Sequence, residues 1–437
     1  MRRLIVLVLC FVLLAGCTTP ATTGKSDKEA TESTIPAFGQ PLGPESEDPQ
    51  QRLTYRRDRV EQYMRHMMSV RWKIDNAVSY SNSNTSLGLE ADAKENERNV
   101  INLLPNQIYQ GIPYTHGGGS GYSFLALATR QDEHGVYILE GLTRELLSGY
   151  SGRDLYNSSR LGNDCADAVF WAWAQVSSTI SFPYTNCMIG SYGCLRVGSY
   201  DCPEIPYTGN TSVITGQNGQ QRMFEAYAQL QKADALVRTS NSAGHAVMAV
   251  RVYVERDDQG LIDGEKSYIT ILEQDVNCEV DTERYFDEAI GQTVYLCEKL
   301  DQHRTFQYLY DVGYLPVTCK ELIDPAPLAD VILDDCVETA DKTNLFTGTI
   351  RASYRIASVT VTITDSEGAL AQKAVCFGLQ EDMYTLDLRR FVSEAEQRVL
   401  LGRIDLDTLT PGSYRCTFTC RLSNGMNLTF RDFALEV

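Results

Sequence analysis

Basic residues are scarce in this sequence. Its 437 residues include 39 Lys and Arg against 57 Asp and Glu, which gives a formal net charge of −18 at pH 7. A chain this acidic is a poor ligand for nucleic acid and for anionic lipid surfaces, because like charges repel. We therefore expect no nucleic acid partner, and we interpret the acidic surface as a source of solubility.

Long apolar runs are equally scarce. The exception is residues 4–14, which follow Arg2 and Arg3 and lead into Leu-Ala-Gly-Cys at 14–17. The run is too short to span a bilayer, and the whole pattern is typical of a bacterial lipoprotein signal with Cys17 as the lipidated residue. We predict a signal peptide over 1–17 and a mature protein held by its lipid on the extracytoplasmic face of a cell membrane.

Several catalytic and metal-binding signatures are missing. The string "HGGG" at 116–119 resembles an esterase oxyanion loop, but the Gly-x-Ser-x-Gly of that class is absent. The spacing of Cys187, Cys194 and Cys202 lacks the Cys-x-x-Cys pairs of zinc sites. The acidic stretch at 257–265 lacks the alternating ligands of a calcium loop. We expect no metal and no other cofactor.

The cysteine count is odd. Of the 13 cysteines, Cys10 lies in the signal and Cys17 at its end, so eleven remain in the mature chain. Outside the cell an odd number leaves at least one thiol unpaired, and spacing does not reveal which cysteines pair. Cys416 and Cys420 lie about 13 Å apart along one expected strand, so they do not bridge each other.

The chain divides by composition. Residues 18–52 are rich in Thr, Ser, Pro and Glu and predict a disordered tether. Residues 53–335 mix helices and strands, and residues 336–437 show short alternating strands between turns, the pattern of an Ig-like β-sandwich. We therefore expect an α+β protein with two folded domains, and we expect it to be a monomer.

Periodicity gives the elements of the first domain. A helix is expected from about Thr54, with Val60, Met64, Met67 and Met68 on its apolar face. Further helices are expected at 166–176 and 221–231, and a hairpin of two strands at 245–255 and 266–275. In the second domain, strands are expected within 356–365, 382–390, 412–422 and 427–437.

Cys165 in "LGNDCADAVFWAW" admits three interpretations. It is a buried apolar filler, half of a disulfide, or a nucleophile at the start of a helix. Asn163 or Asp164 can cap that helix, which puts Cys165 in its first turn. There the unpaired amides and the helix dipole favour the thiolate, which is the attacking species.

A cysteine nucleophile needs a histidine, and only five exist. His66, His134 and His303 are expected at the surface and His116 in a glycine-rich loop, which leaves His245 at the head of a strand. If the hairpin turns between 254 and 267, paired residue numbers sum to about 521, so His245 faces the polar residues at 273–275. Alternation leaves open whether Gln274 or Glu273 shares its face.

Four segments carry a family resemblance: "GIPYTHGGGSG" at 111–121, "GNDCADAVFWAW" at 162–173, "KADALVRTSNSAGHAVMAV" at 232–250, and the polar end of the next strand. Together they resemble the NlpC-type papain-like cysteine peptidases of bacterial cell walls. The resemblance implies a papain-like domain with helices packed on an antiparallel sheet. It also implies a catalytic triad and two residues that contact substrate: Cys165 as nucleophile, His245 as base, Gln274 or Glu273 as orienting residue, and Tyr114 and Asp164 at the substrate.

The resemblance implies a function as well. It predicts an endopeptidase or amidase that cuts stem peptides of peptidoglycan from a membrane anchor. The chain departs from the family pattern at Ala166-Asp167, where Ser-Gly is usual, and at Ala233, where glycine is usual. The alternative from another class is a catalytically inactive lipoprotein that binds cell wall or a partner on the same scaffold.

Overall fold

The computed structural model describes residues 43, 45–81, 100–115, 119–142, 147, 161–181, 185–189, 193–203, 209–240, 243–274, 284–335, 346–376, 385–388 and 404–437. Over these ranges the chain is a mixed α+β protein with six α-helices and mostly antiparallel sheets, so the expected α+β class is confirmed. None of the helices described is long and apolar enough to cross a membrane. Cys17 and His116 lie outside these ranges.

Helix α1 (Pro49–Ser69) opens the described chain. Its four predicted apolar residues are at most 3% exposed: Val60, Met64, Met67 and Met68. The helix begins inside the stretch predicted as tether, because the Asp48 carboxylate accepts a hydrogen bond from the amide of Gln51 and Pro49 occupies the first turn. A polar composition therefore concealed a capped helix start.

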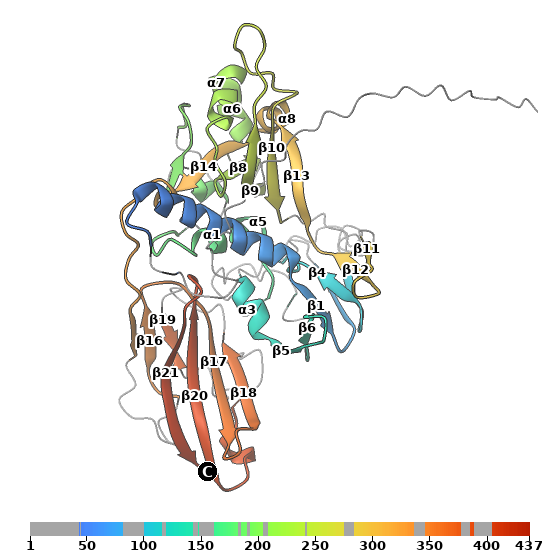
Figure 1. Ribbon diagram of the computed structural model, residues 1–437, viewed down its shortest axis with the longest axis vertical. Coiled ribbons are helices and arrows are strands. Elements are labelled where there is room, and N and C mark those ends of the chain that lie inside the picture. The colour runs from blue at the N-terminus through green and yellow to red at the C-terminus, as the bar shows by residue number, and fades with distance from the viewer. Residues whose placement is uncertain are drawn as a thin grey trace, which may run out of the picture. The chain divides into compact units, whose positions relative to one another are not determined.

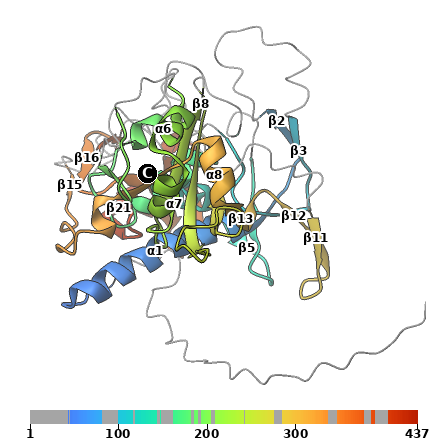
Figure 2. The same cartoon turned by 90° about the horizontal axis from the view of Figure 1, so that it is seen from above.

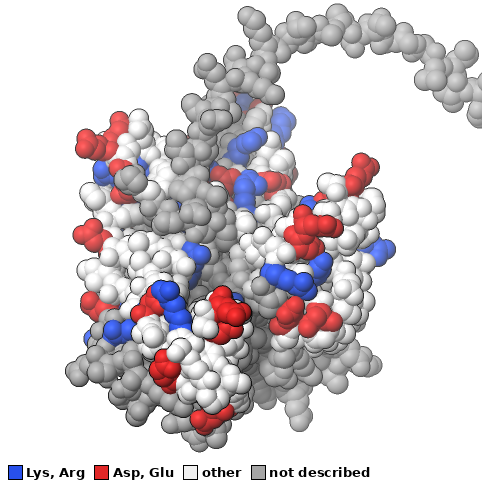
Figure 3. Space-filling view, turned by 60° about the horizontal axis from the view of Figure 1, so that its bottom comes forward, with Lys and Arg blue, Asp and Glu red and all other residues white. Residues whose placement is uncertain are grey.

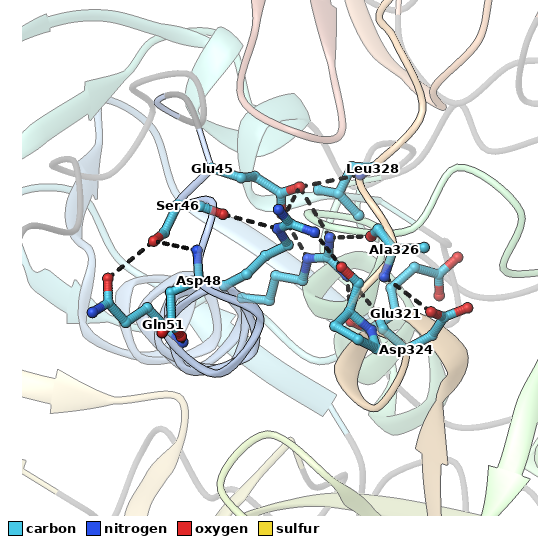
Figure 4. A network of polar contacts seen from close by, with 11 residues as sticks. Glu45, Ser46, Asp48, Gln51, Glu321, Asp324, Ala326 and Leu328 are labelled. Carbon is cyan, nitrogen blue, oxygen red and sulfur yellow. Dashed lines mark hydrogen bonds and ion pairs between the residues drawn. The ribbon is translucent and has the colours of Figure 1, made fainter.

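The N-terminal half of α1 is tied to a distant segment. Arg56 is 1% exposed and pairs with Glu45 at 2.6 Å (Figure 4). Its guanidinium also donates to the backbone carbonyl oxygens of Glu321, Asp324 and Ala326 at 2.6–3.0 Å. A buried arginine is tolerated where its donors are satisfied in this way, so this network fixes α1 against residues 321–328.

The sheet that carries the site has six antiparallel strands. In spatial order they are β13 (Lys299–Thr305), β10 (Tyr268–Glu273), β9 (Ala243–Tyr253), β8 (Ala235–Ser240), β14 (Leu315–Cys319) and β7 (Cys194–Arg196). Helix α5 (Cys165–Trp173) contacts β9. The helices α6 (Thr211–Asn218), α7 (Gln220–Tyr227) and α8 (Phe306–Val312) lie side by side at one end of this sheet (Figures 1 and 2).

A second six-stranded sheet follows α1 and is partly parallel. Its order is β11 (Arg284–Asp287), β12 (Gln292–Leu296), β4 (Ile108–Gln110), β1 (Arg71–Ile74), β6 (Tyr137–Leu139) and β5 (Ala128–Gln131). The short helix α3 (Gly121–Ala126) and the strand pair β2 (Val78–Ser81) and β3 (Val100–Leu103) complete this region. Trp72 on β1 is fully buried and donates to the Gly111 carbonyl at 2.7 Å, which links this sheet to the segment before Tyr114.

The C-terminal region consists of two antiparallel sheets. One contains β15 (Leu333–Asp335), β16 (Thr349–Ala352) and β19 (Thr385–Asp387), and the other β18 (Leu370–Cys376), β17 (Ile356–Asp365), β20 (Ser413–Leu422) and β21 (Asn427–Glu436). Their apolar residues share one buried cluster, to which Ile350 and Phe418 belong. The four predicted strands are present, whereas β18 was not predicted because its apolar and polar residues do not alternate.

The C-terminal region contacts the helix that begins at Cys165. The hydroxyl of Ser423, in the β20–β21 turn, donates to the Ala174 carbonyl at 2.9 Å, and the Gln175 amide donates to the Ser423 carbonyl. Arg355 donates to the Ile180 carbonyl at 2.6 Å. These contacts satisfy polar groups at and after the C-terminal end of α5. Charged side chains of both signs are interspersed on the face shown in Figure 3.

Candidate active site

The start of α5 is set by a side-chain cap. Asp164 has extended backbone angles, and its Oδ1 accepts hydrogen bonds from the amides of Ala166 and Asp167, each at 2.9 Å. Cys165 is therefore the first helical residue, one position before the predicted start at 166. The role that the structure shows for Asp164 is to cap the start of α5. The cap also leaves the backbone N–H of Cys165 out of the capping bonds.

Gly162 is required by the packing of the segment before Cys165. Its φ is +82°, and a Cβ there would lie 2.4 Å from the carbonyl oxygen of Pro113. This close approach lets Tyr114 form a parallel bridge with Asn163 and lets the Thr115 amide donate to the Asn163 carbonyl at 3.0 Å. Tyr114 is 8% exposed and lies beside the segment that precedes Cys165.

His245 lies against Cys165. It is the third residue of β9, the strand that α5 contacts, and the Cys165 side chain lies close enough to the imidazole to raise the pKa of His245. Gly244 allows the neighbouring turn to approach, because a Cβ there would lie 2.6 Å from the Thr185 side chain. Cys165 is 5% exposed and His245 8%, so both lie in a mostly desolvated environment.

Glu273 holds the other side of the imidazole. His245 Nε2 donates to Glu273 Oε1 at 2.8 Å, so Nδ1 is the ring nitrogen left for the sulfur. Glu273 is 6% exposed, and its Oε2 accepts a hydrogen bond from Arg304 Nη2 at 2.6 Å. Hydrogen bonds thus link an imidazole, a carboxylate and a guanidinium from β9 through β10 to β13, and the Cys165 side chain at the start of α5 lies near the imidazole.

The orienting contact belongs to Glu273, the alternative, rather than to Gln274. Near the turn the pairing follows the predicted sum, with Thr270 opposite Arg251, but Ile271 then faces Ala249 because β9 has a bulge at this point. A shift by one residue exchanges the two faces of a strand. The bulge therefore moves Glu273 onto the face of His245 and turns Gln274 away.

Gln274 has another place in the site. Its amide donates to the carbonyl oxygens of Ile112 at 3.1 Å and Asn163 at 3.4 Å. Gln274 is 2% exposed, so these bonds satisfy a buried amide. They join the end of β10 to the segment before Tyr114 and to the segment before Cys165. The Gln274 side chain therefore holds the backbone of the segments next to Cys165, and its two hydrogen bonds do not involve the imidazole of His245.

The charges of the site reinforce one another. Burial alone would lower the pKa of His245, but Cys165 and the Glu273 carboxylate together raise the pKa to about 10. For Glu273, burial would raise the pKa, yet His245 and Arg304 hold it below its ordinary value. The imidazole is therefore held in its protonated form beside an ionised carboxylate, and the Cys165 side chain lies next to that positive charge.

Sequence reasoning missed Arg304 and Tyr314. Arg304 also lies over the ring of Tyr308, with its Cζ 5.6 Å from the ring centre, and this contact fixes its orientation toward Glu273. The Tyr314 ring meets the His245 ring edge-on, with 6.5 Å between centres. Neither contact follows a pattern of neighbouring residues in the sequence. The signal that could have identified a partner for Glu273 was an arginine on β13, the strand that pairs with β10.

The remaining cavities and polar clusters lie elsewhere. Hollows of about 390 Å³ and 320 Å³ are lined by residues of α1 and α7 with their neighbours, and neither lining includes Cys165 or His245. Among the described residues no group of three His, Cys, Asp or Glu side chains is arranged to hold a metal.

Comparisons with known proteins add little. No family model matches the chain, and no curated protein matches it. Among solved structures, one match is a crystal structure of a tetra-tandem repeat in the extending region of a large adhesion protein, at 14% identity and a TM-score of 0.16. The match covers 47% of this chain and 40% of that one, and likeness at this level carries no argument about fold or function.

Proposed function

We propose that this protein is a membrane-anchored, extracytoplasmic cysteine peptidase or amidase that acts on stem peptides of peptidoglycan. The observation that carries the proposal is the arrangement of Cys165, His245 and Glu273, in which the Cys165 side chain lies near an imidazole that a carboxylate holds at 2.8 Å. A nucleophile, a base and an orienting group in this order are the parts of a papain-like triad.

The finer fold assignment belongs to the same proposal. We assign residues 53–335 to an NlpC-type papain-like domain and residues 336–437 to an Ig-like β-sandwich. Support for the first comes from a helix that begins at the nucleophile and packs on the strand of His245. Ala233 adopts a left-handed φ of 72°, a conformation that suits the glycine usual in the family.

The chemistry follows from the geometry. The Cys165 thiolate attacks the carbonyl carbon of the scissile amide, and the amide oxygen takes up the negative charge. The Cys165 N–H, which the Asp164 cap does not use, is a candidate donor to that oxyanion. His245 then gives its proton to the leaving nitrogen as the C–N bond breaks, which leaves a thioester on Cys165 and a free amine.

Hydrolysis of the thioester restores the site. Neutral His245 takes a proton from water while the water oxygen attacks the thioester carbonyl, and the C–S bond breaks to release a carboxylic acid and the thiolate. Glu273 holds the ring in one orientation through both steps, and Arg304 holds Glu273. The imidazole is thus reprotonated next to a carboxylate that stabilises its positive charge.

The substrate class rests on the family resemblance and the signal sequence. A lipid on Cys17 and a tether would keep the enzyme next to the cell wall, whose stem peptides offer amide bonds to a small, mostly desolvated nucleophile. Acidic composition disfavours nucleic acid as a substrate.

Incubation with purified peptidoglycan, followed by mass analysis of the fragments, tests the proposal. We expect wild type to release peptides with a new amine and a new carboxyl terminus, and Cys165→Ala to release none while it keeps its melting temperature. Cys420→Ala removes a buried sulfur in the C-terminal region and serves as the matched control, with cleavage retained. Equal cleavage by Cys165→Ala would contradict the proposal. No cleavage by wild type would favour the inactive wall-binding alternative.

A further inference from the structure

A second pair of cysteines lies at the edge of the site-bearing sheet. In the antiparallel pairing of β7 with β14, Cys194 stands directly opposite Cys319. Directly opposed residues point to the same face, and their Cα atoms lie about 4.5–5.5 Å apart. That range falls inside the 4.4–6.8 Å that a disulfide needs between Cα atoms, and both residues are free cysteines in this structure.

Burial and electrostatics agree with the register. Cys194 is 3% exposed and Cys319 is fully buried, and both belong to the main hydrophobic cluster. Burial first, and then the nearby charges of Glu321 and Cys194, raise the pKa of the Cys319 thiol well above its ordinary value. The two sulfurs therefore lie within electrostatic range of each other, and the native environment keeps Cys319 from reacting as a thiolate.

We propose that Cys194 and Cys319 form a structural disulfide that joins β7 to β14. The bond forms during folding, before the sulfurs are buried, by exchange with a small-molecule or protein disulfide. The thiolate of one cysteine attacks that disulfide, which forms a mixed disulfide and releases one thiol. The thiolate of the other cysteine then attacks the mixed disulfide, which forms the new S–S bond and releases the second thiol, so the two electrons lost by the cysteines reduce the original disulfide. The proposal uses the extracytoplasmic location assigned above, because cytosolic thiols stay reduced.

The position of the two cysteines indicates how the disulfide would stabilise the fold. Strand β7 has three residues and is the last strand of its sheet, and the chain between Cys194 and Cys319 includes β9 and β10. A link across these ends closes a long loop, and such links restrict the unfolded chain most. The disulfide therefore stabilises the fold around His245 while Cys165 stays available as a thiol.

Peptide mapping of the full chain, denatured and refolded in reduced and oxidised glutathione, tests the bond. After alkylation and trypsin digestion, residues 305–320 carry Cys319 alone, whereas residues 161–196 carry Cys165, Cys187 and Cys194. Fragmentation of the linked peptide must therefore assign the sulfur. We expect a link from Cys194 to Cys319, its loss in Cys194→Ser, and its retention in Cys297→Ser, which changes a different buried cysteine.

Thermal unfolding gives an independent readout. Reduction should lower the melting temperature of wild type by about 5–10 °C and leave the Cys194→Ser/Cys319→Ser double variant unchanged. An alkylated Cys319 after refolding, or a link from Cys319 to Cys165 or Cys187, would overturn the pairing. Because neither readout measures cleavage, failure of the disulfide and failure of the peptidase proposal remain separate results.

Discussion

Two regions of this molecule bury cysteines in different chemical surroundings. In the C-terminal region, Cys416 and Cys420 on β20 are fully buried among apolar residues, and burial raises the pKa of each thiol to about 12. In the site-bearing region, Cys165 is almost as buried but lies near an imidazole whose pKa Cys165 and Glu273 raise, and Arg304 helps to hold the pKa of Glu273 below its ordinary value. Burial alone suppresses a thiol, whereas burial beside a fixed positive charge favours the thiolate.

The comparison also explains why position within an element matters. Cys165 is the first residue of a helix, where the backbone amides point outward and carry partial positive charge. Cys416 and Cys420 lie within a strand whose amides are paired with β17 and β21. Substitutions that remove one part of this difference at a time should have unequal effects, which decrease from Glu273 to Arg304.

Removal of the Glu273 charge should have the largest effect among the supporting residues. Glu273→Gln keeps the shape of the side chain but no longer stabilises the imidazolium, so kcat/KM for a stem-peptide substrate should fall by about 10²–10⁴-fold. Gln274→Ala is the matched control on the neighbouring residue, and we expect a loss within about 10-fold because it removes backbone support only. A larger loss from Gln274→Ala than from Glu273→Gln would restore Gln274 as the third residue.

Thiol labelling compares the two regions directly. With iodoacetamide near neutral pH, Cys165 should react faster than Cys416 and Cys420, because it lies beside a protonated imidazole whereas burial raises the pKa of the other two thiols. His245→Ala should slow labelling of Cys165 by roughly 10-fold or more, whereas His303→Ala, which removes a ring stacked on Tyr268, should not. Rates are read peptide by peptide from mass spectra. Equal labelling rates at Cys165, Cys416 and Cys420 in wild type would contradict the proposed difference in reactivity between the two regions.

Arg304 should have the smallest effect, because it acts through Glu273. Arg304→Ala leaves the carboxylate free to rotate and raises the pKa of Glu273, so we expect kcat to fall by about 10-fold and the acid limb of the pH profile to move to higher pH. Arg304→Lys keeps the charge and should restore the position of that limb. An unchanged pH profile in Arg304→Ala, with only the melting temperature lowered, would assign Arg304 a purely structural role.

Local signals predicted much of the fold. The strand at 356–365 has the predicted limits, and the four apolar residues of α1 were identified from their spacing. Cys165 and His245 could be found because each stands at the start of an apolar element. By contrast, β7 and β14 were not predicted, since strands of three and five residues carry too little periodicity.

The third residue depended on a feature that periodicity does not encode. The hairpin rule gave the correct register near the turn, and a single bulge in β9 then reversed which face Glu273 and Gln274 occupy. Bulges depend on the packing of both neighbouring strands. Arg304 was missed for a related reason, because its contact joins residues 31 positions apart across a strand order that the sequence did not reveal.

Titration of the histidine imidazoles by NMR tests the central claim most directly. The chain has only five histidines, so His245 can be assigned by comparison with His245→Gln. We predict that His245 in wild type stays protonated until the pH approaches about 10, and that Cys165→Ser and Glu273→Gln each lower that value. The raised pKa means that wild type is stabilised relative to His245→Gln below about pH 6.5. That advantage should disappear as the pH rises through about 10. An imidazole that titrates near its ordinary value and does not respond to Cys165→Ser would contradict the thiolate–imidazolium pair.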